Sequence, residues 1–225
     1  SGKVDRESGM TRAALIDLDG FLINSEELYF EANRIYFKEY GFGFTEALHR
    51  EGTGKKFAEW IKTVTDIDKT GEEILKERNI IFFDLASKKL KLLHGADKFL
   101  TILHKNFKTA LVTSSKMDYV NFVFDITKID GFFDLIITGE DVVRGKPDPD
   151  CYLMAAEKLG ALPSECVVFE DAPSGILAGK NARMKVVAIP SQFVKGDTVF
   201  GKADLVLNNL DEAALEAEKW IETQN

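Results

Sequence analysis

The sequence contains few residues of the kinds that build thiol or histidine metal centres. It has two cysteines, Cys151 and Cys166, and three histidines, His49, His94 and His104, among 225 residues. The two cysteines have no spacing typical of a metal site, so we expect both thiols to be reduced and structural. The histidines are scattered along the chain. Neither residue type predicts a metal centre.

Long apolar runs and positive charge are also lacking. No run approaches the roughly 20 apolar residues that a bilayer span requires, and the polar start, residues 1–10, lacks the apolar middle of a signal peptide. We therefore expect a cytoplasmic protein with no membrane partner. The formal net charge of −8 disfavours a nucleic-acid partner, because a phosphate backbone would be repelled. A small anionic substrate would need a metal ion or well-placed lysines.

The composition, with 45% hydrophobic and 29% charged residues, is that of a globular protein with a sizeable core. Short β-rich runs alternate with helical patterns over most of the chain, which predicts an α/β fold with a Rossmann-like parallel sheet and helices on both faces. The expected strands are residues 13–17, 109–113, 134–138, 166–170, 185–189 and 203–207. The expected helices are residues 97–104, 117–124, 150–159, 174–182 and a terminal helix that carries Leu210, Ala214, Ala217 and Ile221 on one face.

Residues 25–93 contain helical periodicity and no convincing strand. Apolar side chains at 57, 60, 61 and 64 follow a helical spacing, and residues 74, 78, 81 and 85 repeat it less cleanly because position 78 is an arginine. Ser25 is suited to cap a first helix that Gly41 ends. We predict a helical cap domain over residues 24–93, inserted into a core of residues 10–23 and 94–225.

Two carboxylates follow the first predicted strand. Asp17 and Asp19 are one residue apart, so they share a face if the strand geometry continues. Close anions raise each other's pKa unless a cation neutralises them. A solvated strand end with an Asp-Gly turn is the alternative interpretation of this short stretch.

Three further polar groups follow later strands, where open α/β sheets bind their ligands. Thr113 and Ser114 end one apolar run and are suited to a phosphate oxygen or to ordinary helix capping. Lys146 lies in a glycine- and proline-containing loop, where it can act as a point charge on a phosphoryl group. Glu170 and Asp171 end another apolar run and offer the hard oxygen ligands that suit Mg²⁺.

Together these motifs resemble those of the haloacid dehalogenase-like superfamily of aspartate-nucleophile phosphotransferases. The resemblance implies that Asp17 is the nucleophile and that Asp19 is the general acid and base. It implies Mg²⁺ held by Asp17, the main-chain carbonyl of Asp19 and Asp171, with Glu170 as a further ligand. It also implies that phosphoryl oxygens are bound by Thr113, Lys146 and the backbone amides of Ser114 and Gly20.

The predicted cap is similar to that of the subgroup containing sugar-phosphate phosphatases and β-phosphoglucomutase. Residues 49–56 are expected to form a glycine-containing, basic loop before the helix that begins at Phe57. In this loop, Lys55 resembles a position at which the mutases contact substrate with a cation, although a solvated basic helix start is an equal alternative. The sequence departs from the family pattern at Phe21 and Asn24, beside the hinge of the cap. Tyr29 stands where the mutases carry a histidine, which weakens the mutase hypothesis.

These features predict a Mg²⁺-dependent phosphatase of a small phosphorylated metabolite, such as a sugar phosphate, acting through an aspartyl-phosphate. A phosphomutase and a non-catalytic binding protein on the same fold are the alternatives. The second acid, Asp19, disfavours a dehalogenase. The substrate's identity and the choice between monomer and dimer are left open by the sequence.

Overall fold

The computed structural model describes residues 11–194 and 196–224, with side chains described to residue 220. The predicted boundary at residue 10, the polar start of the chain and the side chain of Ile221 lie outside the described residues. The strands of the described part form one parallel sheet in the order β3-β2-β1-β4-β5-β6. Their bounds are β1 (Ala13–Ile16), β2 (Lys108–Val112), β3 (Leu135–Ile137), β4 (Cys166–Glu170), β5 (Lys185–Ala188) and β6 (Leu205–Val206). The predicted α/β parallel sheet is confirmed.

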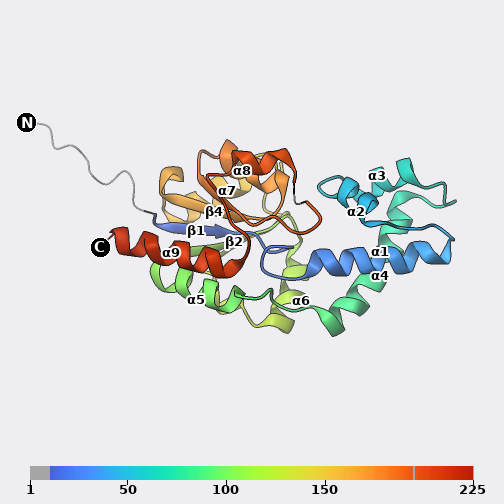
Figure 1. The fold of residues 1–225 in the computed structure, drawn as a ribbon, viewed down its shortest axis with the longest axis horizontal. Coiled ribbons are helices and arrows are strands. Elements are labelled where there is room, and N and C mark those ends of the chain that lie inside the picture. The colour runs from blue at the N-terminus through green and yellow to red at the C-terminus, as the bar shows by residue number, and fades with distance from the viewer. Residues whose placement is uncertain (1–10, 195, 225) are drawn as a thin grey trace, which may run out of the picture.

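The central strands are buried on both faces, because helices cover the sheet from both sides. Ala14 and Ile16 of β1 belong to one apolar cluster, whereas Ala13 and Leu15 belong to the other. This alternation is that of a strand between two cores. The first cluster is covered by α5 (Ala96–Asn106), α6 (Met117–Thr127) and α9 (Leu210–Gln224), and the second by α7 (Asp150–Leu159) and α8 (Pro173–Asn181), as Figure 1 shows.

Four further helices lie beyond the carboxyl end of β1 (Figure 1): α1 (Ser25–Glu39), α2 (Glu46–Gly52), α3 (Phe57–Val64) and α4 (Gly71–Lys89). We call them the cap helices. They share an apolar cluster of their own, which includes Phe37, Trp60 and Ile61. The predicted division of the chain at residues 24 and 93 remains a prediction. Among the described residues, every helix falls short of the length and apolarity that a membrane span requires.

The ends of the cap helices correct two predictions. Ser25 is the first residue of α1 and does not cap it, because Asn24 occupies the N-cap position and the Ser25 hydroxyl accepts a hydrogen bond from the Gly20 amide at 3.1 Å. The predicted basic loop over residues 49–56 is shorter, since α2 continues to Gly52. Gly41 does follow the end of α1, with φ of +69° and the paired carboxyl-terminal hydrogen bonds typical of a glycine-terminated helix.

The two connections between the sheet and the cap helices run side by side. Asn24 joins them, because its Oδ1 accepts from the Lys91 amide at 2.9 Å and its Nδ2 donates to the Lys89 carbonyl at 3.3 Å. Asn24, which departs from the family pattern, therefore joins the two connections by hydrogen bonds. Phe21 is buried against Phe99 and Phe169, with ring centres 5.9 and 6.2 Å away. It fills an apolar gap beneath the hinge.

Candidate active site

The acidic motifs meet where the strand order of the sheet reverses. β1 and β4 are neighbours, and the β1 ladder continues past its end because the Asp17 amide donates to the Phe169 carbonyl at 3.0 Å. Asp17 follows β1, and Glu170 and Asp171 stand at the end of β4. Such a switch point is the usual ligand site of an open α/β sheet.

Lys146 bridges the two acidic motifs. Its Nζ donates to Asp17 Oδ1 and Glu170 Oε1, both at 2.6 Å, and to the Val112 carbonyl at 3.0 Å. The side chain is only 6% exposed. Burial alone would lower the pKa of Lys146, but the Asp17 and Glu170 carboxylates raise this pKa well above its usual value. The lysine therefore carries a fixed positive charge beside Asp17.

The Glu170 carboxylate accepts hydrogen bonds from four groups, of which Lys146 is one. Its Oε1 also accepts from the Tyr152 hydroxyl at 2.7 Å, and its Oε2 accepts from the amides of Asp171 and Ala172 at 3.2 and 3.3 Å. Sequence reasoning missed Tyr152, which lies on the helix that follows the lysine loop. An aromatic hydroxyl on the first turn of that helix was the only available signal.

Three buried carboxylates form a site that fits a divalent cation. Asp17, Glu170 and Asp171 each offer an oxygen, and these oxygens lie within 4.8 Å of one another. Asp171 Oδ1 is buried without a hydrogen-bond partner, and a side chain at Gly20 would overlap the Asp171 carboxylate. Burial, followed by neighbouring negative charge, raises the pKa of Asp17 and of Asp171 well above the usual value. One lysine among three acids leaves negative charge that a hard cation would neutralise.

Asp19 lies apart from Lys146 and is held by two hydroxyls. Tyr119 donates to Asp19 Oδ1 and Ser115 donates to Asp19 Oδ2, each at 2.8 Å. Burial raises the pKa of Asp19, and the hydrogen bonds from the two hydroxyls oppose that rise. Neither hydroxyl was predicted as a site residue. Ser115 follows Thr113 and Ser114 directly, and Tyr119 comes four residues after Ser115. This spacing only weakly indicated that the two hydroxyls lie near Asp19.

The predicted phosphate-binding residues differ in their burial and in their distance from the acidic cluster. Thr113 is buried, and its Oγ1 accepts from the Ser115 amide at 3.0 Å, which shapes the turn after β2. Ser114 is exposed at the same turn. Gly20, with φ of +76°, lies against Asp171. Lys55 is elsewhere, among the cap helices, where it pairs with Glu51 at 3.3 Å.

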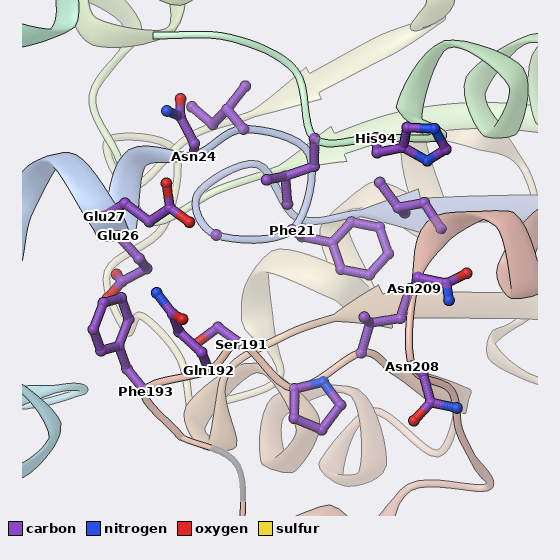
Figure 2. Close-up of a pocket in the computed structure, with 16 residues that line it drawn as sticks. Phe21, Asn24, Glu26, Glu27, His94, Ser191, Gln192, Phe193, Asn208 and Asn209 are labelled. Carbon is purple, nitrogen blue, oxygen red and sulfur yellow. The ribbon is translucent and has the colours of Figure 1, made fainter. Parts of the chain in front are cut away.

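A cavity of about 310 Å³ opens beside the loop of the first motif. In Figure 2, Phe21 lies between Glu26, Gln192 and Phe193 on one side and His94, Asn208 and Asn209 on the other. Phe193 connects the sheet's loops to the cap helices, since its ring centre lies 4.5 Å from that of His49 and 5.5 Å from that of Phe30. His49 in turn is 3.2 Å from Glu26. The loop after β5 thus packs directly against α1 and α2.

Comparison with known proteins gives consistent matches. Residues 14–189 match the model of the haloacid dehalogenase-like hydrolases. A phosphorylated carbohydrates phosphatase of Thermotoga maritima is 33% identical over 76% of this chain and 81% of its own. Validoxylamine A 7'-phosphate phosphatase of Streptomyces hygroscopicus subsp. limoneus is 31% identical over 90% of this chain and 96% of its own. A crystal structure of a candidate β-phosphoglucomutase from Thermotoga maritima superposes with a TM-score of 0.78 at 28% identity, covering 93% of this chain and 99% of that one.

Proposed function

The chain belongs to the haloacid dehalogenase-like hydrolase family and is a phosphoric monoester hydrolase, and we propose that it acts on a small phosphorylated carbohydrate or related polyol. The observation that carries this proposal is the contact of Lys146 with both acidic motifs, which brings a candidate nucleophile, a cation and a metal-fitting cluster together. Two relatives that match over most of their own length, the phosphorylated carbohydrates phosphatase and the validoxylamine A 7'-phosphate phosphatase, are named as phosphatases of phosphorylated small molecules.

In the first step, a carboxylate oxygen of Asp17 attacks the substrate phosphorus. A bond forms between that oxygen and phosphorus, and the ester bond to the sugar oxygen breaks. Asp19 gives a proton to the departing oxygen, so that the sugar leaves as an alcohol. Ser115 and Tyr119 fix the orientation of Asp19 for this transfer.

In the second step, Asp19 takes a proton from a water molecule, and that water attacks the phosphorus of the aspartyl-phosphate. The bond to Asp17 breaks, inorganic phosphate leaves, and both aspartates return to their starting protonation. Lys146 stabilises the charge spread over the phosphoryl oxygens throughout. Thr113, Ser114 and Gly20 remain our proposed phosphate contacts through hydroxyl and amide donors.

The cation we propose is Mg²⁺, held by Asp17, Asp171 and the carbonyl of Asp19, with Glu170 as a further ligand. When bound, it lowers the repulsion between the Asp17 carboxylate and the phosphate dianion. Asp171 is the best supported side-chain ligand, because its Oδ1 has no protein partner. Glu170 is already occupied by Lys146 and Tyr152, so it contributes mainly by fixing the lysine.

A phosphomutase on the same framework is the less favoured function. Tyr29, which stands where the mutases carry a histidine, stacks on Phe82 with ring centres 3.9 Å apart. This packing gives Tyr29 a structural role in the cap helices. A mutase would release little phosphate and would form a sugar bisphosphate intermediate.

Phosphate release from a panel of phosphorylated sugars and polyols, with Mg²⁺ and with chelator, tests the proposed function. We expect metal-dependent release from at least one class, and its loss in Asp17→Asn. Full turnover by that variant, or transfer of phosphate to a second sugar in place of water, would overturn the proposal.

A further inference from the structure

A buried arginine in the cap helices forms no ion pair with any described residue. Arg78 of α4 is 5% exposed, and its Nε is buried without a hydrogen-bond partner. Among the described residues, no carboxylate lies within ion-pair distance of its guanidinium. The group is instead held between two rings, with Cζ 4.9 Å from the centre of Tyr29 and 4.5 Å from that of Phe57.

This arrangement does not fully replace the hydration that the arginine guanidinium loses on burial. The ring faces attract the cation, but they replace only part of the hydration that burial removes. Burial lowers the pKa of Arg78 to about 10, although the nearby Tyr29 and Glu26 groups oppose part of this shift, so the guanidinium is still positively charged at neutral pH. Buried charges in proteins are normally paired or hydrogen-bonded. An anion that binds beside Arg78 would complete its environment.

The guanidinium lies on a cavity large enough for such a group. A cavity of about 230 Å³ lies between α1, α2, α3 and α4. Its lining includes Arg78, Asn33, Tyr29 and Lys55. Asn33 Oδ1 is a second buried atom without a partner. The other charged residues that line the cavity have partners of opposite charge or hydrogen-bonding partners. Lys55 pairs with Glu51, and Glu26 contacts His49. Arg78 is the charge in this cavity without such a partner.

The cavity lies close to one of the proposed catalytic residues, Asp19. Glu26 lines both this cavity and the one beside the first-motif loop. Tyr29 is close enough to Asp19 and to Arg78 for both charges to act on its hydroxyl, and it interacts with Tyr119, the donor to Asp19. A molecule whose phosphate is bound at Asp17 would approach Arg78 by passing Asp19 and Tyr29.

We propose that this cavity binds a second anionic group on the substrate, with the Arg78 guanidinium as its direct ligand. Asn33 Oδ1 accepts a hydrogen bond from a neighbouring hydroxyl of the same molecule. The substrate class is then a hydroxylated phosphate monoester with a second phosphate or a carboxylate at its far end. This inference rests on the proposed function, because it assigns the far end of the molecule whose phosphate Asp17 attacks.

Calorimetric binding to the Asp17→Asn protein with Mg²⁺ tests the site without turnover. The probes are glucose 6-phosphate, glucose 1,6-bisphosphate and 6-phosphogluconate, which separate a single phosphate from a second phosphate and from a second carboxylate. We expect at least one two-anion probe to bind tenfold or more tightly than glucose 6-phosphate. Equal affinities for all three would overturn the proposal.

The same measurements on Arg78→Met in that background should reduce the preference to within about twofold. Arg78→Lys, which keeps the charge, should retain part of it and remains informative if the methionine variant does not fold. Arg34→Met is the matched control, because Arg34 also lies over a ring, that of Phe30 at 5.8 Å, but is exposed and outside the cavity. A preference that survives Arg78→Met, or is lost in Arg34→Met, would contradict the assignment.

These outcomes are separable from failure of the proposed function. Wild-type protein that binds two-anion probes through Arg78 but hydrolyses no phosphate monoester would refute the hydrolysis and keep the binding site. Hydrolysis of sugar monophosphates with kcat/KM unaffected by Arg78→Met, and no preference for a second anion, would keep the hydrolysis and refute the site.

Discussion

Lys146 Nζ lies 2.6 Å from Asp17 Oδ1, across 129 residues of sequence. The contact depends on the sheet order, which places the carboxyl end of β1 beside those of β2 and β4. Removing the lysine would leave the Asp17 and Glu170 carboxylates buried and without their shared cation. The same substitution therefore affects both stability and catalysis.

Lys146→Met should lower kcat by about 100-fold or more, because the charge on the transferred phosphoryl group loses its partner. It should also lower the free energy of unfolding by about 3–5 kcal/mol, the usual effect of breaking a buried ion pair. Denaturation with and without Mg²⁺ checks this, and Mg²⁺ should restore part of the loss. Lys180→Met, which breaks a half-exposed pair with Asp204, should cost less than about 1 kcal/mol. Equal effects of the two substitutions would contradict the account.

Tyr119→Phe should reduce kcat by about 10-fold or more with little change in KM, because Asp19 loses one of the hydroxyls that orient it for proton transfer. Steady-state kinetics measure the effect. Tyr36→Phe is the matched control, since Tyr36 donates to Glu77 at 2.7 Å in the cap helices. It should affect stability by about 1–2 kcal/mol and leave kcat unchanged. An unchanged kcat in Tyr119→Phe would remove Tyr119 from the proposed mechanism.

Gly175→Ala should disrupt the acidic cluster, because a methyl group there would overlap the Glu170 carboxylate. We expect a destabilisation of about 1–3 kcal/mol from overpacking, together with weaker retention of Lys146 and of any bound cation. Gly131→Ala provides the control, as its added methyl group meets no atom within 4 Å. Thermal melts and Mg²⁺ titrations of both variants make the comparison, and a harmless Gly175→Ala would show that Glu170 is not fixed as described.

Thr70→Ala should cost about 1 kcal/mol of stability, because Thr70 and Glu73 form a capping box at the start of α4. Hydrogen bonds from the Thr70 backbone amide and from the Thr70 hydroxyl lower the pKa of Glu73, and Thr70→Ala removes the second of these bonds. Glu73 therefore contributes stability above its unfolded pKa, and this contribution is lost as the pH falls through the lower folded value. The difference between wild type and Thr70→Ala should shrink in acid. Ser87→Ala, in the same helix, should show no such pH dependence.

The sequence predicted the sheet well because its strands are short apolar runs bounded by polar residues. The bounds of β4 and α7 agree with the predictions, and the ends of the other predicted strands and helices differ by at most three residues. Ser25 was wrongly assigned as a cap, because the polar residue before it already occupies that position. A local pattern does not say which of two neighbouring polar residues begins the helix.

The residues that hold the acids could not be predicted in the same way. Tyr119 and Tyr152 act on Asp19 and Glu170 through contacts that form only when distant segments pack together. Arg78 interrupted the apolar pattern of α4, which marked the position as unusual without showing that its charge is unpaired. Local periodicity predicts which face is buried, whereas the partner of a buried polar group depends on the tertiary fold.

Trapping of the covalent intermediate tests the central claim most directly. The protein is mixed with ³²P-labelled acetyl phosphate and Mg²⁺, quenched in acid within milliseconds, and mapped by peptide. We predict label on the peptide that contains Asp17, its release by hydroxylamine, and its absence in Asp17→Asn. Label on another residue, or a full burst of phosphate with no labelled peptide, would contradict Asp17 as the nucleophile.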